Sequence, residues 1–244
     1  MNIPRRIEPE WLDEFPAEDS RAMRSRRDLR RVNAMMGNAI IVARELGRSY
    51  RGGPPRLIAE IGAGDGTFML RLAERASTRW QDVNVVLLDR QDIVGAATLH
   101  GFVRLGWRAK SVTADVFEWL AQPADQVYDV IIANLFLHHF DAARLTILLS
   151  LLAQRARMFI ACEPRRSGLS LVGSRLLGLI GCNDVSRHDA VVSVRAGFDG
   201  KELSALWSAR RAWKLQERAN GVFSHCFVAC RAGGDSAVGR GEEW

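Results

Sequence analysis

Residues 60–67 read Glu-Ile-Gly-Ala-Gly-Asp-Gly-Thr, and this stretch decides how the rest of the chain is interpreted. It ends a short apolar run and precedes residues 66–76, whose apolar spacing is helical. Glycine is needed where a backbone turns sharply and lies close to a ligand. The first turn of a helix offers free N–H groups to an anionic or polar group. The stretch therefore predicts a strand, a ligand-binding turn and a helix.

Two phosphate-binding patterns are absent from this turn. The dinucleotide fingerprint G-x-G-x-x-G requires glycine at position 67, where the chain has Thr67. The phosphate loop G-x-x-x-x-G-K-[ST] does not occur here either. The glycine spacing is G-x-G-x-G, preceded by the acidic Glu60, which disfavours a nicotinamide-dependent oxidoreductase.

From residue 56 onward, apolar strands alternate with helices. We expect strands at 57–61, 83–88, 107–113, 127–133 and 158–162, and helices at 66–76, 93–105, 117–121 and 142–155. Such alternation is typical of parallel βαβ units in a doubly wound sheet.

The two ends of the chain depart from this alternation. Residues 18–46 carry apolar side chains at steps of three and four and predict one helix after an irregular start at 1–15. Near the C-terminus we expect a helix at 200–209 and strands at 212–219 and 222–231. Asn220-Gly221 between these strands is a strong hairpin signal.

These patterns predict one α/β domain with additions. We expect residues 1–53 to form an N-terminal helical lid, 54–232 the main domain, and 233–244 a polar tail. The connection 164–199 is long for a βα loop and is interpreted as an insertion with a short apolar helix at 169–180.

Acidic residues stand at three successive strand ends. Glu60 precedes the first glycine, Asp89 ends the second strand, and Asp115 follows the third. An acidic side chain at such a position can accept both hydroxyls of a ribose, and another can accept an adenine amine while Val116 packs on the ring. Together they predict a nucleoside bound across the carboxyl edge of the sheet.

This set of residues resembles the class I S-adenosylmethionine-dependent methyltransferases. The glycine turn is similar to their first motif, E/D-x-G-x-G-x-G, and Asp89 and Asp115 match the later acidic positions. Residues 129–140, DVIIANLFLHHF, resemble the fourth motif, and the terminal hairpin resembles the reversed seventh strand. The resemblance covers about residues 56–231. It implies a Rossmann-like, doubly wound seven-stranded sheet, with S-adenosylmethionine as methyl donor and S-adenosylhomocysteine as product.

The resemblance also implies which residues bind the donor. They are Glu60, Gly62, Ala63, Gly64, Gly66, Asp89, Arg90, Asp115, Val116, Asn134 and Leu135. Leu137-His138-His139-Phe140 resembles quinone methyltransferases and the L-H-D/N-W segment of phenolic O-methyltransferases. Cys162-Glu163-Pro164 resembles the v-E-P segment of the same small-molecule branch.

Histidine suits proton transfer at neutral pH, because its pKa lies near 6.5. By the resemblance His138 is the first candidate for the base and His139 the second; alternatively, both pack or cap the next helix. Four further residues are candidates for acceptor binding at the insertion, which would cap the acceptor site: Glu163, Arg165, Arg166 and His188. The alternatives are surface ion pairs for the arginines and a turn for His188-Asp189.

The function implied is methylation of a small, aromatic or quinone-like, lipophilic acceptor, on oxygen in preference to carbon. A non-catalytic S-adenosylmethionine-binding subunit and an RNA methyltransferase are the alternatives. Methyltransferases of DNA and RNA amines carry [DN]-P-P-[YF] where this chain has residues 134–137, NLFL, so we expect no nucleic-acid partner. We expect no metal, and a monomer or weak homodimer.

Composition adds few constraints. The net charge is +6, and all but three of the 34 basic residues are arginines, spread along the chain. The four cysteines match no zinc pattern, and Cys226 and Cys230 share one face of a strand. The first residues lack the apolar core of a signal peptide, and no apolar run is long enough to span a bilayer. We therefore expect a cytoplasmic protein with no transmembrane span. The apolar stretch 169–180 has two open interpretations, a roof over the acceptor pocket or a peripheral membrane contact.

Overall fold

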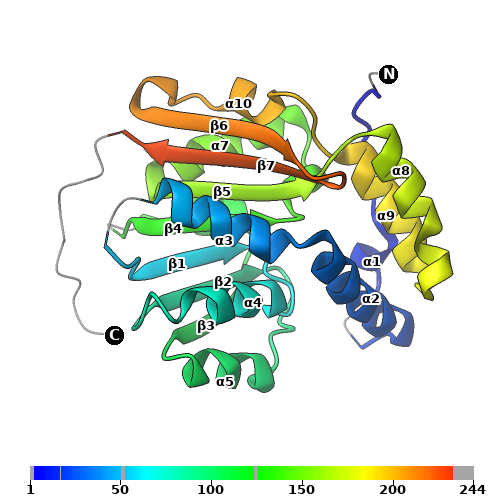
Figure 1. Ribbon diagram of the computed structural model, residues 1–244, viewed down its shortest axis with the longest axis horizontal. Coiled ribbons are helices and arrows are strands. Elements are labelled where there is room, and N and C mark those ends of the chain that lie inside the picture. The colour runs from blue at the N-terminus through cyan, green and yellow to red at the C-terminus, as the bar shows by residue number, and fades with distance from the viewer. Residues whose placement is uncertain (1–2, 17, 51–52, 124–125, 233–244) are drawn as a thin grey trace.

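A computed structural model describes residues 3–16, 18–50, 53–123 and 126–232. Its centre is a seven-stranded sheet in the order β3-β2-β1-β4-β5-β7-β6 (Figure 1). The strands are β1 (Leu57–Ile61), β2 (Asn84–Asp89), β3 (Arg108–Thr113), β4 (Tyr128–Asn134), β5 (Ala156–Pro164), β6 (Trp213–Asn220) and β7 (Ser224–Arg231). Strands β1 to β5 pair in parallel, and β7 pairs antiparallel with both β5 and β6. The carboxyl ends of five strands therefore meet at one edge.

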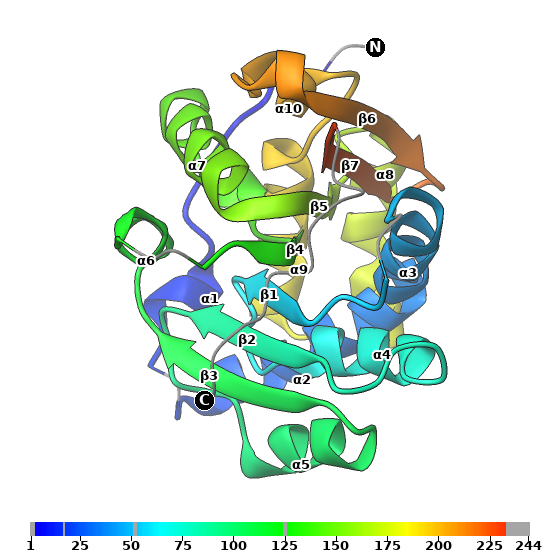
Figure 2. The same cartoon turned by 90° about the vertical axis from the view of Figure 1, so that its left-hand side faces the viewer.

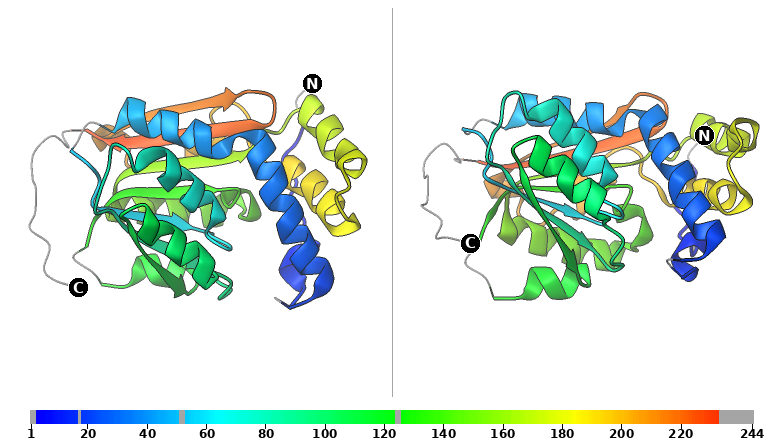
Figure 3. Two further views of the ribbon diagram at one scale, coloured as in Figure 1. Left: turned by 60° about the horizontal axis from the view of Figure 1, so that its bottom comes forward. Right: turned by 90° about the horizontal axis from the view of Figure 1, so that it is seen from below.

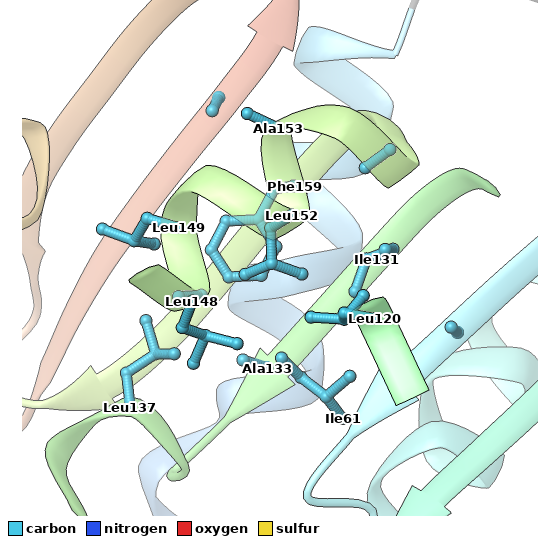
Figure 4. Close-up of a cluster of buried hydrophobic side chains, with 14 of the residues drawn as sticks. Ile61, Leu120, Ile131, Ala133, Leu137, Leu148, Leu149, Leu152, Ala153 and Phe159 are labelled. Carbon is cyan, nitrogen blue, oxygen red and sulfur yellow. The ribbon is translucent and has the colours of Figure 1, made fainter. Parts of the chain in front are cut away.

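Helices cover both faces of the sheet (Figure 2). One layer is α3 (Asn38–Ser49), α4 (Thr67–Ala76) and α5 (Ala96–Arg104), and the other is α6 (Val116–Ala121), α7 (Ala142–Arg155) and α10 (Glu202–Leu206). In the second layer Leu148 and Leu152 pack against Ile131 and Phe159 of the sheet (Figure 4). Because both faces are covered, the central strands are apolar runs rather than alternating ones.

The remaining helices gather beyond the carboxyl ends of the strands (Figure 3). They are α1 (Trp11–Glu14), α2 (Ser20–Met36), α8 (Gly168–Arg175) and α9 (Asp184–Ala196), with the 3₁₀ turns η1 (Leu137–His139) and η2 (Leu176–Ile180); a third 3₁₀ turn, η3 (Arg210–Ala212), precedes β6. In the described part of the chain, no helix is long and apolar enough to cross a bilayer.

The predicted fold class is confirmed, including the terminal hairpin, where Gly221 takes a φ of +68°. Cys226 and Cys230 pack into the same core cluster, as expected. The expected single helix at 18–46 is wrong: Gly37, at φ +69°, ends α2 and begins α3, since its left-handed backbone cannot continue a helix. The expected helix at 200–209 is also shorter, and the predicted tail at 233–244 lies outside the described residues.

The insertion holds a helix that the sequence did not predict. Residues His188 and Asp189, for which a turn was the main alternative, lie in α9. Asn183 caps this helix by accepting the N–H of Ser186, and the apolar face of α9 buries Val185 and Val192. The helix was missed because its polar residues are dense and its apolar spacing is weak.

Candidate active site

The glycine turn takes the backbone shape that its sequence predicts. Gly62, Gly64 and Gly66 have φ values of +68°, +55° and +73°, a region where side chains are strained. Ala63 donates its N–H to the carbonyl of Leu88 at 2.9 Å, which ties the turn to the end of β2. Gly66 then precedes α4, so the first N–H groups of that helix face the strand ends.

Asp89 at the end of β2 holds this turn in place. Its Oδ2 accepts the N–H of Gly64 at 2.7 Å, and its Oδ1 accepts the N–H of Gln91 at 2.9 Å. A carboxylate oxygen can accept more than one hydrogen bond, so both oxygens retain capacity for the hydroxyls of a ligand. Asp115 caps α6 by accepting the N–H of Phe117 at 2.8 Å.

Glu60 is buried at the end of β1 with one oxygen, Oε2, that has no hydrogen-bond partner among the described residues. Burial raises the pKa of Glu60 well above its usual 4.5, and the negative charges of Asp65 and Asp89 add to this effect. The buried Oδ1 of Asn33 in α2 also has no hydrogen-bond partner among the described residues. Buried polar atoms are normally paired, so these two favour a polar ligand.

A cavity of about 990 Å³ runs along the carboxyl edge of the sheet. Of the expected donor-binding residues, all except Gly66 line it: Glu60, Gly62, Ala63, Gly64, Asp89, Arg90, Asp115, Val116, Asn134 and Leu135. Gly66 lies behind the wall, where an added Cβ would meet Leu87 Cδ1 at 2.9 Å. The cavity continues past the strand ends to His138 and His139.

His138 is held between two carboxylates. Its Nδ1 lies 2.8 Å from Glu163 Oε2, and its Nε2 lies 3.3 Å from Glu10 Oε1. Burial by itself lowers the pKa of His138, but the hydrogen bonds and charges of Glu10 and Glu163 outweigh it and raise the pKa to about 9. At neutral pH this side chain is therefore an imidazolium with both nitrogens engaged.

His139 has the opposite electrostatic environment. Burial lowers its pKa below the usual 6.5, and the neighbouring charge of His138 lowers it further. Its ring centroid lies 4.3 Å from that of His138, and its Nδ1 lies 3.6 Å from Asp13 Oδ2. The His139 side chain is 28% exposed, against 4% for His138. His139 is thus neutral and more accessible from the cavity.

The cavity wall includes an N-terminal strap, residues 3–16, which sequence analysis treated as the irregular start of the predicted lid. Ile7, Glu8, Pro9, Glu10, Leu12 and Asp13 of the strap line the cavity. Asp189 of α9 holds it by accepting the N–H groups of Trp11 and Leu12 at 2.9 and 3.0 Å. Arg5 donates to the carbonyl of Phe140 at 2.9 Å. No local pattern in residues 3–16 signals this role, since the partners of Arg5, Trp11 and Leu12 given above lie more than 130 positions away.

The four candidate acceptor-binding residues do not line the cavity. Glu163 is buried beneath η1, where it accepts the N–H groups of Phe136, Leu137 and His138. Arg166 is buried and pairs with Glu202, Arg165 donates to the carbonyl of Gly221, and His188 stacks on Trp11 with ring centroids 3.8 Å apart. In the described residues, Glu163 orients His138, His188 stacks on Trp11 of the strap, and Arg166 also donates to the carbonyl of Ile3 in the strap at 2.7 Å.

Within the described residues, one group has the composition of a metal site. Ligand atoms of Glu10, His138 and His139 lie within 4.8 Å of one another. His138 Nε2 and Glu10 Oε1 already form a hydrogen bond with each other, and the hydroxyl of Ser193 also donates to Glu10. The sequence-based expectation that no metal takes part stays a prediction.

The charges of the strap predict a pH-dependent stability. Burial by itself raises the pKa of Glu10, but hydrogen bonds to His138 and Ser193 and the charges of the two histidines outweigh it and lower this pKa to about 2. The pKa of His138 is raised to about 9. A raised pKa stabilises the fold fully below pH 6.5, and this stabilisation is lost as the pH rises to 9. We expect a loss of about 2–4 kcal/mol in the free energy of unfolding over that range.

This pH dependence of the free energy of unfolding is measured by denaturant unfolding of wild type and Glu10→Gln from pH 5 to pH 9.5. The free energy of unfolding of the wild type should exceed that of Glu10→Gln at pH 6, and the two values should approach each other above pH 9. Glu14→Gln is the matched control, because Glu14 is exposed in α1, the short helix that directly follows Glu10. A difference between wild type and Glu10→Gln that stays constant across the range would contradict the assignment.

Comparison with known proteins agrees with the fold. No protein-family model and no curated protein matches the sequence. An O-methyltransferase family protein from Burkholderia thailandensis is 18% identical, with a TM-score of 0.60 over 90% of this chain and 62% of that one. Mitomycin 7-O-methyltransferase MmcR is 17% identical, with a TM-score of 0.59 over 91% and 60%. Magnesium protoporphyrin IX methyltransferase ChlM from Synechocystis PCC 6803 is 14% identical, with a TM-score of 0.54 over 91% of each chain.

The chain therefore has the Rossmann-like fold of these methyltransferases, as the sequence resemblance implied. It spans about six tenths of the length of the first two.

Proposed function

We propose that the protein transfers a methyl group from S-adenosylmethionine to a hydroxyl of a small, lipophilic, aromatic or quinone-like acceptor. One observation carries the proposal: a single cavity joins the glycine turn and its acidic strand ends to a pair of histidines. Its volume of about 990 Å³ lies at the upper end for small-molecule sites, which suits two ligands held end to end.

The residues at the glycine turn fit the donor. Asp89 offers two acceptor oxygens for ribose hydroxyls, and Asp115 with Val116 offers an acceptor beside an apolar surface for adenine. The unpartnered Glu60 Oε2 and Asn33 Oδ1 suit the ammonium group of the methionine part. Arg30 of α2 lines the cavity and pairs with Asp65 at 2.6 Å, and its guanidinium suits the donor carboxylate. When bound, S-adenosylmethionine supplies a methyl carbon attached to a positively charged sulfur.

The cavity wall next to the histidine pair is aromatic and apolar. Phe136 and Phe140 pack edge to face with ring centroids 5.1 Å apart, and Arg144 lies over Phe140 at 5.3 Å. Ile7 and Leu12 of the strap complete this wall. Aromatic rings and a guanidinium favour a flat acceptor whose oxygen carries a negative charge as it loses its proton.

We assign the proton acceptor to His139. It is neutral at pH 7 and reaches the cavity, whereas both nitrogens of His138 are engaged. His139 takes the hydroxyl proton of the acceptor, and the oxygen then carries the electron pair that forms the new bond to the methyl carbon. The bond from that carbon to sulfur would break at the same time, and its electron pair would leave on the sulfur of S-adenosylhomocysteine. His138 is a positioning residue, fixed by Glu163 at the end of β5 and by Glu10 of the strap.

The strap and α2 together serve as the lid over both ligands. Arg26, Leu29, Arg30, Asn33 and Ala34 of α2 line the cavity across from the strand ends. Excluding water from the reacting groups strengthens the electrostatic interactions of the site.

Replacing Asp89 by alanine tests the donor site. The change removes the acceptors for the ribose hydroxyls and the anchor of Gly64, so affinity for S-adenosylhomocysteine should fall by at least about tenfold. Isothermal titration measures it, with Asp92→Ala as the matched control, because Asp92 is exposed nearby and does not line the cavity. Equal affinities of Asp89→Ala and wild type would remove Asp89 from the donor site.

Turnover separates the proposed function from its alternatives. Purified protein is incubated with radiolabelled S-adenosylmethionine and a panel of phenols and quinols, or with RNA. Labelled ether products support the proposal. Tight binding of S-adenosylhomocysteine without any product indicates a non-catalytic subunit, and labelled RNA indicates an RNA methyltransferase.

A further inference from the structure

An apolar surface lies at the end of the molecule formed by the insertion. We name it the α8 face, and it consists of exposed side chains of α8, η2 and the β6–β7 turn: Leu169, Val172, Leu176, Leu179, Ile180, Val222 and Phe223. Leu179 is 83% exposed and Leu169 is 68% exposed. The helical members recur at steps of three and four, so they share one side of the α8–η2 segment. Neither the cavity nor the proposed mechanism uses them.

The α8 face is built as one unit. Ser170 of α8 donates its hydroxyl to the carbonyl of Val222 at 3.0 Å. Gly173 leaves room for Phe223, whose Cε1 lies 2.6 Å from where a Cβ at that glycine would stand. The hairpin turn therefore packs on the helix, and their apolar side chains form a continuous surface. Contiguous exposed apolar patches on soluble proteins mark interaction sites.

The charges around the α8 face have one sign. Residues 164–183 contain no aspartate or glutamate, and the turn between β6 and β7 has no acidic residue. Of the three arginines in residues 164–183, Arg166 is buried and paired with Glu202, which leaves Arg165 and Arg175. Arg175 lies within the segment, Arg165 donates to Gly221 beside the turn, and Arg187 of α9 lies against Gly178. The nearest acid along the chain, Asp184, is paired with Arg21 at 2.6 Å.

We propose that the α8 face docks on an anionic lipid bilayer. Leucine, valine and phenylalanine side chains enter the interface while the arginines contact lipid phosphates. A second copy of this chain fits less well, because a two-fold contact through the α8 face would bring like charges together. The face lies at the same end of the molecule as the strap and α9 (Figures 1 and 3), so docking places the acceptor end of the cavity near the bilayer.

Vesicle sedimentation with the full chain tests this inference. Wild-type protein should bind vesicles of phosphatidylcholine with about 30 mol% phosphatidylglycerol and bind pure phosphatidylcholine vesicles much less. The double variant Leu176→Glu with Leu179→Glu should lose at least about tenfold in bound fraction, since it places charge on the inserted side. Ile147→Glu is the matched control, because Ile147 is 56% exposed on α7, outside the α8 face.

Folding is checked by thermal melting, and all changed positions are exposed. Arg175→Glu with Arg187→Glu is a second variant, which should weaken binding to the anionic vesicles alone. Wild-type protein that fails to bind, or a double leucine variant that binds as well as Ile147→Glu, would overturn the proposal. A wild-type dimer that the leucine changes dissociate, without vesicle binding, would also overturn it and make the α8 face a contact between copies. Because vesicle binding is measured without methyl transfer, its outcome is independent of the proposed function.

Discussion

Gly62→Ala should abolish donor binding and destabilise the fold. The φ of Gly62 is +68°, which strains an alanine by about 1–2 kcal/mol. The new Cβ would also lie 2.2 Å from Cδ2 and 2.6 Å from Cγ of Phe136. Overpacking of this kind adds about 1–3 kcal/mol, so the free energy of unfolding should fall by about 2–5 kcal/mol. Phe136 must move toward the cavity or the turn must open, and either change removes the surface on which the donor lies.

Gly221→Ala separates backbone strain from steric clash. Gly221 has the same φ of +68°, lies in the distant hairpin turn, and has no atom within 4 Å of the added Cβ. The free energy of unfolding of Gly221→Ala should fall only by the cost of backbone strain, and this variant should keep its affinity for S-adenosylhomocysteine. Denaturant unfolding and isothermal titration of the two variants give the comparison. Equal losses of stability would show that the contact with Phe136 has no energetic weight.

The parts of the site that sequence predicted are those encoded within a few residues of a strand end. The glycine turn, Asp89 and Asp115 each follow a buried strand, and parallel strands bring their carboxyl ends to one edge. Strand order need not be known for this argument, because any doubly wound sheet gathers these ends. The histidine pair was predictable for the same reason, because η1, which contains it, directly follows the end of β4.

The features that sequence missed depend on contacts between distant segments. Glu10 meets His138 across 128 positions, and nothing near Glu10 distinguishes it from a solvated carboxylate. Arg166 was a candidate for acceptor binding because it follows β5, but its side chain turns to Glu202 on the other side of the insertion. Which of two adjacent histidines is neutral depends on these carboxylates, and the family resemblance that favoured His138 carries no information on Glu10.

Leu135 shows how a local strain supports the site. It follows β4 with a φ of +53°, a region that costs a non-glycine residue about 1–2 kcal/mol. Its N–H donates to the carbonyl of Cys162 at 2.9 Å, which holds the turn in that shape. The strained turn directs the chain into η1, so the position of His139, the proposed base, depends on the backbone as well as on Glu163.

His139→Ala should lower kcat by about 10²–10⁴-fold, the range by which a positioned acid–base group accelerates a reaction. Affinity for S-adenosylhomocysteine should stay unchanged, because His139 lies at the acceptor end of the cavity. The pKa of His139 is lowered below 6.5, so the kcat of wild-type enzyme should rise as the pH increases through that lowered pKa and then level off. Added imidazole should restore part of the activity of His139→Ala, since the change leaves space for a free base.

His100→Ala is the matched control, because His100 is exposed in α5 and does not line the cavity. A kcat for His139→Ala equal to that of the control would mean that the acceptor loses its proton to water or to another group. His138→Gln distinguishes a positioning residue from a base. It keeps a hydrogen-bonding side chain between Glu163 and Glu10 but has no titratable nitrogen. If His138 only positions η1, its variant should retain the pH dependence of kcat, whereas loss of that dependence would assign the proton to His138 instead.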